Sequence, residues 1–231
     1  MSSQLLLELL PPPAPGFENF VAGDNAEALA ALAGLAAGAA GERIVYLWGP
    51  AGSGRSHLLR ACVASAREHG RVAACLGAAA DPAGWPEADA LLALDDVERC
   101  DPGTQAALFL RLLAAREGAG QVLAAGSVAP AALGLRDDVR TRLGSGWVFQ
   151  VRPLSDEEKL AALAARAAAR GFHLPPDAAA YLLTRCPRDL PNLLAWLDRL
   201  DRRSLERQRP VTVRLLRELL ERREPGQDGA V

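Results

Sequence analysis

The chain has 231 residues, of which half are apolar and 23% are charged, and its formal net charge is −2. This length is sufficient for one large or two small domains with a buried core. The near-neutral charge gives no global basic surface for nucleic acid, so DNA is expected only as an indirect or weak partner. No apolar run reaches the roughly 18 residues of a membrane-spanning helix, and no membrane association is expected.

The N-terminal segment, residues 1–16, predicts a flexible tail. A leucine-rich stretch is followed by a cluster of prolines, which favour an extended chain that cannot pack on itself. The stretch has the form of a linear binding peptide, with an amide side chain as polar anchor and leucines for an apolar cleft. The residues expected to bind a partner in this way are Gln4, Leu5, Leu7 and Leu9.

The central feature of the sequence is the glycine-rich stretch 49–56, between an apolar strand at 44–48 and a helix at about 55–68. Strand, glycine loop and helix is the context of a phosphate-binding P-loop, in which backbone N–H groups point at phosphate oxygens. Arg55 stands where the P-loop pattern has lysine, so the charge is kept on a bulkier planar group. We therefore expect a nucleotide to be held well and hydrolysed poorly. The predicted nucleotide-binding residues here are Gly49, Pro50, Gly52, Ser53, Gly54, Arg55, Ser56 and His57.

A short strand at 72–76 precedes an apolar strand at 90–94 that ends in Asp95 and Asp96. Carboxylates at the end of a strand downstream of a P-loop are where such enzymes hold magnesium and polarise the attacking water. A strand followed by a merely acidic turn is the alternative. The predicted magnesium-side residues are Ser56, Asp95 and Asp96.

The remaining elements predict an α/β fold with a parallel sheet in three αβα layers, followed by a small all-α domain. The expected elements are a helix at about 26–37, a helix at 104–116, a strand at 121–125, an irregular helical stretch at 129–142, a strand at 147–151, and helices at 155–171, 176–185, 190–204 and 212–223. Ser155 and Glu158 form a capping box for the first helix of the all-α part. The predicted division is a tail at 1–16, a nucleotide-binding domain at 17–153, a helical domain at 154–223 and a disordered end at 224–231.

The four cysteines, at 62, 75, 100 and 186, show no C-x-x-C spacing. They predict small buried apolar side chains in a reducing compartment, the cytoplasm. The three histidines, at 57, 69 and 173, have no partner at metal-ligand spacing, so no structural metal site is expected.

Several motifs together resemble the AAA+ fold, within it the DnaA branch, and most closely the Hda family of regulatory inactivators of DnaA. The motifs are Q-L-x-L-x-L from Gln4, F-V-A-G-D-N from Phe20, Y-L-W-G-x5-R-S-H-L-L from Tyr46, R-L at Arg142, and P-L-S-D-E-E-K-L from Pro153. The resemblance covers about residues 2–222. DnaA has a further DNA-binding domain after its lid, so direct origin binding is not expected of this chain.

The resemblance implies a negative regulator of replication initiation, with ADP or ATP as ligand and Mg²⁺ as an optional companion. Such proteins dock on the DNA-loaded sliding clamp, the beta subunit of the polymerase, through the glutamine-leucine peptide, and promote hydrolysis of DnaA-bound ATP. Localisation would be cytoplasmic, at the nucleoid through the clamp, with self-association left open. Arg142 matches the arginine finger that acts in trans. Arg136 and Arg140 are neighbouring candidates, and an arginine facing solvent or neutralising Asp137 and Asp138 is the alternative.

Two positions depart from the family pattern. Ser127 stands where the family commonly has an acidic residue after the strand at 121–125. In the helical domain, which corresponds to the lid of these proteins, Pro191 stands where the family has an arginine that contacts the nucleotide phosphates. Arg188 could substitute for that arginine. Both departures count against self-hydrolysis. An autonomous P-loop ATPase that acts as a replication loader or remodeller through Asp96 and Arg55 remains the main alternative, and a nucleotide-free adaptor between clamp and partner is a third.

Overall fold

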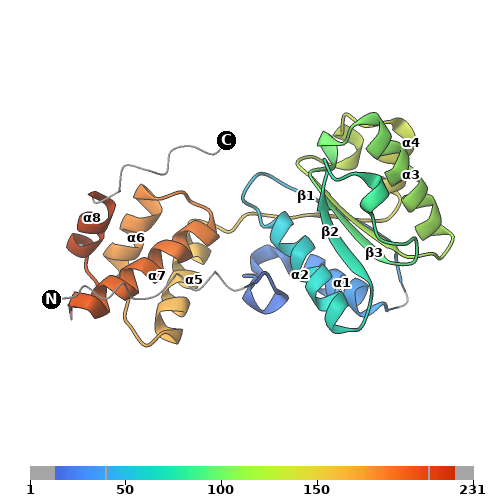
Figure 1. Ribbon diagram of the computed structural model, residues 1–231. Helices are drawn as coiled ribbons and strands as arrows, with labels where there is room; N and C mark the ends of the chain where they lie inside the picture. The colour runs from blue at the N-terminus through green and yellow to red at the C-terminus, as the bar shows by residue number, and fades with distance from the viewer. Residues whose placement is uncertain (1–13, 40, 208, 222–231) are drawn as a thin grey trace.

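The computed structural model describes residues 14–39, 41–207 and 209–221. The chain forms a parallel sheet flanked by helices, followed by a group of four further helices that lies beside it (Figure 1). The tail residues Gln4, Leu5, Leu7 and Leu9 lie outside the described residues.

All five strands of the sheet are parallel, in the order β2-β3-β4-β1-β5. Their bounds are β1 Ile44–Trp48, β2 Ala73–Gly77, β3 Leu91–Asp95, β4 Gln121–Gly126 and β5 Trp147–Gln150. The predicted parallel α/β sheet is confirmed, with strand ends within one residue of those expected. Because β1 lies between β4 and β5, the loop that follows β1 leaves the sheet beside the carboxyl end of β4.

Helices cover both faces of the sheet. Along β1, Val45 and Leu47 pack against α1 (Ala26–Ala37) and α2 (Arg55–Glu68). The alternate residues of the same strand face α3 (Pro102–Arg116) and α4 (Asp137–Gly144) on the other side. The irregular stretch expected at 129–142 consists of the short 3-10 helix η5 (Pro130–Ala132) and α4. The three predicted layers are therefore present.

The C-terminal helices have an apolar core of their own, built mainly from leucines and alanines. These helices are α5 Asp156–Ala169, α6 Pro176–Arg185, α7 Leu190–Arg207 and α8 Val213–Glu221. The predicted capping box is confirmed, since the Glu158 carboxylate accepts from the Ser155 backbone N–H at 2.7 Å and the Ser155 hydroxyl accepts from the Glu158 N–H at 3.1 Å. Helix α7 continues three residues beyond the predicted end at Ser204.

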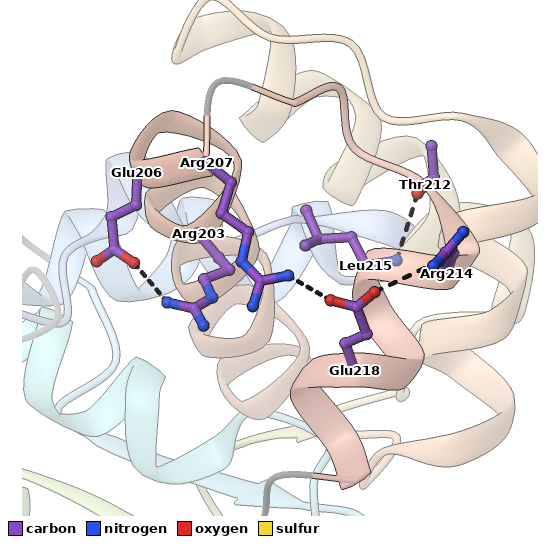
Figure 2. A network of polar contacts seen from close by, with 7 residues as sticks. All are labelled: Arg203, Glu206, Arg207, Thr212, Arg214, Leu215 and Glu218. Atoms are coloured by element: carbon purple, nitrogen blue, oxygen red, sulfur yellow. Dashed lines mark hydrogen bonds and ion pairs between the residues drawn. The ribbon is translucent and has the colours of Figure 1, made fainter.

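One ion pair, between Arg207 and Glu218, joins the C-terminal end of α7 to α8, and further pairs lie within each helix. Figure 2 shows Glu218 of α8 between Arg207 of α7 and Arg214 of its own helix. Arg203 pairs with Glu206 one turn along α7 at 2.8 Å. Arg203, Arg207 and Arg214 are thus neutralised by neighbouring carboxylates, as on a solvated helix surface.

Asn25 links the first helix to the end of β5. It occupies the N-cap position of α1, but its side chain does not cap the helix. Its amide oxygen accepts from the Arg152 backbone N–H at 2.8 Å, and its amide nitrogen donates to the Arg152 carbonyl at 2.9 Å. Asp24 and Asn25, directly before an alanine-rich helix, predict an N-cap at this point of the sequence. The position is right, but the Asn25 side chain does not cap the helix, because the contact with Arg152 takes both of its polar atoms.

None of the four cysteines forms a disulfide with another described residue. Cys62, Cys100 and Cys186 are buried as expected, whereas Cys75 on β2 is only half-buried because β2 is an edge strand. Among the helices that the structure describes, none is long and apolar enough to cross a membrane.

Candidate nucleotide site

The loop from Gly49 to Ser56 joins the carboxyl end of β1 to the start of α2. Gly52 and Gly54 have φ values of 77° and 102°, in the left-handed region that glycine adopts without strain. A side chain at Gly49 would run into the Val151 carbonyl. The glycines are thus required by the path of the backbone, which follows the geometry that the P-loop pattern predicts.

A segment before α1 packs on this loop. The Phe20 ring lies against Gly54, where an added Cβ atom would be 2.7 Å from the nearest ring carbon. The same ring contacts the His57 imidazole, with ring centres 5.4 Å apart. His57 Nε2 lies 2.9 Å from the Gly16 carbonyl, so it carries the proton and donates this bond. His57, which the sequence predicts as a nucleotide-binding residue, therefore also anchors the start of the described chain to α2. Its place in the sequence does not indicate this second role.

Two polar atoms of the loop are buried without a hydrogen-bond partner among the described residues. They are the Ser53 hydroxyl oxygen and Nη1 of the Arg55 guanidinium. Leaving such atoms unpaired costs about 1–3 kcal/mol each, more for a charged group, so they are normally satisfied by a ligand or water. A hydroxyl and a fixed cation in a glycine loop at a helix N-terminus fit a phosphate group. The residues present therefore suit the phosphates of a nucleotide.

Asp95 and Asp96 lie at the carboxyl end of β3, the second strand from the loop. Asp96 has φ 52°, a left-handed backbone that is unusual for a residue other than glycine. The Asp95 carboxylate accepts from the Asp96 N–H at 3.0 Å, and Asp96 lies 3.8 Å from Arg99 in an exposed pair. No cluster of three metal-ligating side chains occurs in the part of the chain that the structure describes. Ser56, at the N-terminus of α2, and Asp95 have the oxygen donors that Mg²⁺ prefers.

A third carboxylate near the loop, Glu98, was missed by the sequence reasoning. It lies on the 3-10 helix η4 (Val97–Arg99) and accepts from the Ser127 backbone N–H at 3.0 Å. Burial by itself favours the protonated acid, but the contacts with Ser127 and the charge of Arg55 outweigh it and lower the pKa of Glu98. Its other oxygen, Oε2, is buried without a partner among the described residues.

Tyr46 lies beside Glu98 beneath the carboxyl end of the sheet. Its hydroxyl donates to the Val128 carbonyl at 2.8 Å. Burial is the main cause that raises the pKa of Tyr46, the Glu98 charge adds to it, and Arg55 opposes it. Tyr46, Arg55 and Glu98 therefore share one electrostatic environment at the end of β1, which no local sequence pattern predicts.

The C-terminal helices approach the loop through the turn before α7. An added Cβ atom on Gly52 would lie 3.9 Å from the Asp189 Cβ atom. Asp189 accepts from the Asn192 N–H at 3.0 Å and so caps α7, whose first turn contains Pro191. The predicted nucleotide contact Arg188 instead pairs with Asp156 of α5 at 3.5 Å, with most of its side chain exposed. The Cβ atom of Asp189, and not the Arg188 guanidinium, is thus the part of this turn that lies near Gly52.

Arg142 lies on α4, on the opposite face of the sheet from the P-loop helix α2. Arg136 pairs with Asp138 at 2.6 Å and Arg140 pairs with Asp137 at 2.5 Å. Within the described ranges, Arg142 forms no ion pair. Its guanidinium lies 5.3 Å from the centre of the Phe109 ring on α3. Of the three candidate finger arginines, Arg142 alone keeps its charge unneutralised by a carboxylate among these residues.

Comparison with solved structures identifies the fold. Domain III of the replication initiation protein DnaA from Thermotoga maritima is 19% identical with a TM-score of 0.73, over 91% of this chain and 97% of that one. AMPPCP-bound DnaA from Aquifex aeolicus is 19% identical with a TM-score of 0.70, over 83% of this chain and 66% of that one. The Holliday junction branch migration motor RuvB from Thermotoga maritima is 14% identical with a TM-score of 0.66, over 90% of this chain and 71% of that one. At these identities the likeness is one of fold, the AAA+ fold.

A family model adds the finer identification. Residues 156–220, which span all four C-terminal helices, match the model described as "Hda, lid domain". The predicted resemblance to a DnaA homologue of the Hda type is confirmed at this level. Residues 156–220 thus resemble the Hda lid domain, and the chain as a whole has the fold of DnaA domain III.

Proposed function

We propose that the chain is a regulatory AAA+ protein of DNA replication that holds ADP in its own P-loop and promotes hydrolysis of ATP bound to DnaA. The observation that carries this proposal is the state of Arg142. It lies on α4, which covers the face of the sheet opposite to α2, makes no ion pair among the described residues, and lies over the Phe109 ring. A cation placed in this way is available to a partner's nucleotide.

The nucleotide would be held by the loop at residues 49–57. Backbone N–H groups at the start of α2, the Ser53 hydroxyl and the Arg55 guanidinium supply donors for the phosphates. A bound nucleotide would also lie between the sheet and the turn at Asp189, since that turn faces Gly52. The proposed task of the nucleotide is to hold the sheet domain and the C-terminal helices in one arrangement. Arg188 would leave its exposed pair with Asp156 to contact the nucleotide.

Arg142 would act as an arginine finger in trans. A finger places a fixed cation beside the charge that builds on the transferring phosphoryl group and raises hydrolysis by about 10³–10⁵ fold. The planar guanidinium is always protonated and donates in a fixed geometry. The Phe109 ring would limit the rotamers of Arg142 before the partner arrives, so that less conformational entropy is lost on docking.

Docking on the sliding clamp would use the peptide Gln4–Leu9. The described chain begins close to α2, because His57 binds the Gly16 carbonyl there. A peptide that is tethered at this point raises the local concentration of the whole protein on the clamp and, through the clamp, near DnaA on DNA. DNA contact would follow from this tether and needs no strongly basic surface.

The test is single-turnover hydrolysis of labelled ATP on DnaA, with DNA-loaded clamp and an excess of this protein. Arg142→Ala is expected to remove at least a hundredfold of the stimulation. Arg140→Ala is the matched control, since Arg140 lies on the same helix and is already paired with Asp137. In the control, the stimulation of hydrolysis is expected to fall by less than about threefold, because an exposed ion pair contributes little free energy. Full stimulation by Arg142→Ala would refute the finger role.

One observation favours the alternative of an autonomous ATPase. The left-handed backbone of Asp96 is a strained feature of the kind that gathers at functional sites. In this alternative Asp96 would polarise water on the chain's own nucleotide. Turnover of ATP by the purified protein alone at about 1 s⁻¹ or faster, lost in Asp96→Asn, would favour it over the regulatory role.

A further inference from the structure

A pocket of about 240 Å³ lies between the start of the described chain, helix α2 and the edge strand β2. Helix α2 supplies Arg60, Val63 and Arg67, which recur at helical spacing and therefore share one face of the helix. Cys75 of β2 lines the pocket as well. Because the valine is buried and both arginines are exposed, the pocket has an apolar floor with positive charge on either side of it along the helix.

The positive charge of this pocket is not neutralised by a described carboxylate. Neither Arg60 nor Arg67 forms an ion pair among the described residues. Arg67 is held toward β2, because its Nε donates to the Ala73 carbonyl at 3.0 Å. Burial raises the pKa of Cys75 and the charge of Asp95 adds to it, whereas the charges of both arginines oppose it. The pocket therefore suits a segment that combines one negative charge with apolar side chains.

The described chain starts at a fixed point on the rim of this pocket. Ala14 and Pro15 are among the residues that line it. The Asn19 side chain donates to the Ala14 carbonyl at 2.8 Å and accepts from the Gly16 N–H at 3.0 Å. The Gly16 carbonyl in turn accepts from His57 of α2. Residues 1–13 are thus joined to the chain beside the pocket.

The composition and length of residues 1–13 match the pocket. Glu8 is the only charged side chain in this part of the sequence, and Leu9 and Leu10 follow it directly. Five residue steps separate Leu9 from Ala14 and span up to about 18 Å. The two arginines of the pocket are about 10 Å apart along the helix, so the leucines reach the floor between them. The pocket is smaller than the usual range of about 300–1,000 Å³ for small-molecule sites, which favours side chains of a peptide as its occupant.

We propose that in the free protein Leu9 and Leu10 occupy this pocket, with Glu8 beside the arginines of α2. A short tether gives the segment an effective concentration on the order of millimolar at the pocket, so weak contacts are sufficient to hold it. Glu8 and Leu9 also belong to the proposed clamp-binding peptide, and the clamp therefore has to displace them from the pocket. This displacement rests on the proposed function, whereas the docking of the segment on its own chain does not.

Cys75 reports on the occupancy of the pocket, because it is half-buried there while the other three cysteines are buried. The experiment measures the rate at which N-ethylmaleimide alkylates Cys75 in the full chain, by mass spectrometry after digestion. Leu9→Ser/Leu10→Ser is expected to raise this rate about threefold or more, since access of the reagent follows the population of the open form. The control Leu205→Ser changes a leucine that is 72% exposed on α7, and it should leave the rate unchanged.

Two further measurements separate the parts of the proposal. Glu8→Gln should raise the alkylation rate by a smaller factor, because it removes the charge and keeps the leucines. Saturating sliding clamp should raise the rate in wild type to that of Leu9→Ser/Leu10→Ser and should leave the double variant unchanged. Retention on immobilised clamp, measured in parallel, distinguishes a failure of displacement from a failure of clamp docking itself.

Equal alkylation rates of Cys75 in wild type and in Leu9→Ser/Leu10→Ser would overturn the docking of the segment. Protection of Cys75 that is lost when the wild-type protein is diluted would assign the pocket to a second copy of the chain, and would overturn it as well. An unchanged rate in wild type that is retained on the clamp would overturn the displacement. The assay contains no DnaA, so each of these outcomes is distinguishable from failure of the Arg142 test.

Discussion

The guanidinium of Arg142 on α4 lies 5.3 Å from the centre of the Phe109 ring on α3. Phe109 is partly buried against the core on that face of the sheet, so the ring is held in place. Arg136 lies over the same ring at 6.0 Å but is also paired with Asp138. Phe109 therefore forms a platform for a cation that the rest of α4 leaves unneutralised.

Replacing the ring with an aliphatic side chain tests this platform. We expect Phe109→Leu to keep most of the apolar packing and to lose the cation–π contact, which is worth about 0.5–1 kcal/mol at an exposed site. Stimulation of DnaA-bound ATP hydrolysis should fall two- to fivefold, far less than in Arg142→Ala. The double variant should show no further loss beyond Arg142→Ala alone. Additive losses would mean that Phe109 acts independently of Arg142.

Asn25→Ala is expected to destabilise the protein. The change leaves the part-buried N–H and carbonyl of Arg152 without their partner, at a cost of about 1–3 kcal/mol for the two groups together. The exposed Asn192, which bonds to Asp189, is the control, and Asn192→Ala should cost less than about 1 kcal/mol. Urea unfolding followed by circular dichroism measures both. Equal effects would show that the link between α1 and the end of β5 contributes little.

Replacing Gly54 or Gly34 with alanine should change the stability of the protein in opposite directions. Gly54→Ala forces alanine to φ 102° and into the Phe20 ring, which we expect to cost about 1–3 kcal/mol and to weaken ADP binding. Gly34 lies within α1 with open space around it, so Gly34→Ala should stabilise by about 0.5–1 kcal/mol. Thermal unfolding and ADP titration separate the two. A tolerated Gly54→Ala with normal ADP affinity would contradict the tight packing of Phe20 on the loop.

Added ADP should raise the unfolding temperature of the wild-type protein. A ligand at a hundredfold its Kd stabilises the folded state by about 2.7 kcal/mol. We expect Arg55→Ala to remove most of this shift, because it deletes the cation of the loop, whose Nη1 atom is buried without a partner among the described residues. The control Arg60→Ala changes an exposed arginine on the same helix and should leave the shift intact. The absence of any shift in wild type would favour the nucleotide-free adaptor.

Stability should decline in alkaline solution. Burial raises the pKa of Cys62 to about 12 and that of Cys100 to about 11. In the unfolded chain these thiols lose their protons near pH 8.5, so between about pH 9 and 11 the folded state binds more protons and its stability falls as the pH rises. Urea midpoints at pH 8 and pH 10 measure the effect. Cys62→Ala should reduce the pH dependence, and an unchanged slope would contradict the assignment.

The sequence by itself determined the elements and the identity of the loop. Periodicity located β1 and α2, and the spacing of glycines in 49–56 indicated a phosphate loop, because these features depend only on residues near one another in the chain. The capping box at Ser155 and Glu158 was equally local. Motifs in both halves of the chain are also sufficient to indicate a relative of DnaA.

Only the tertiary structure decided which side chains share a site. Glu98 meets Ser127 because β3 and β4 are neighbours in the sheet, and strand order does not follow from the pattern of any single strand. The Asn25 side chain does not cap the helix as expected, because it bonds to the backbone of Arg152, which lies 127 positions further along the chain. Packing thus brings together groups such as Glu98 and Ser127, whose separation in the sequence carries no signal.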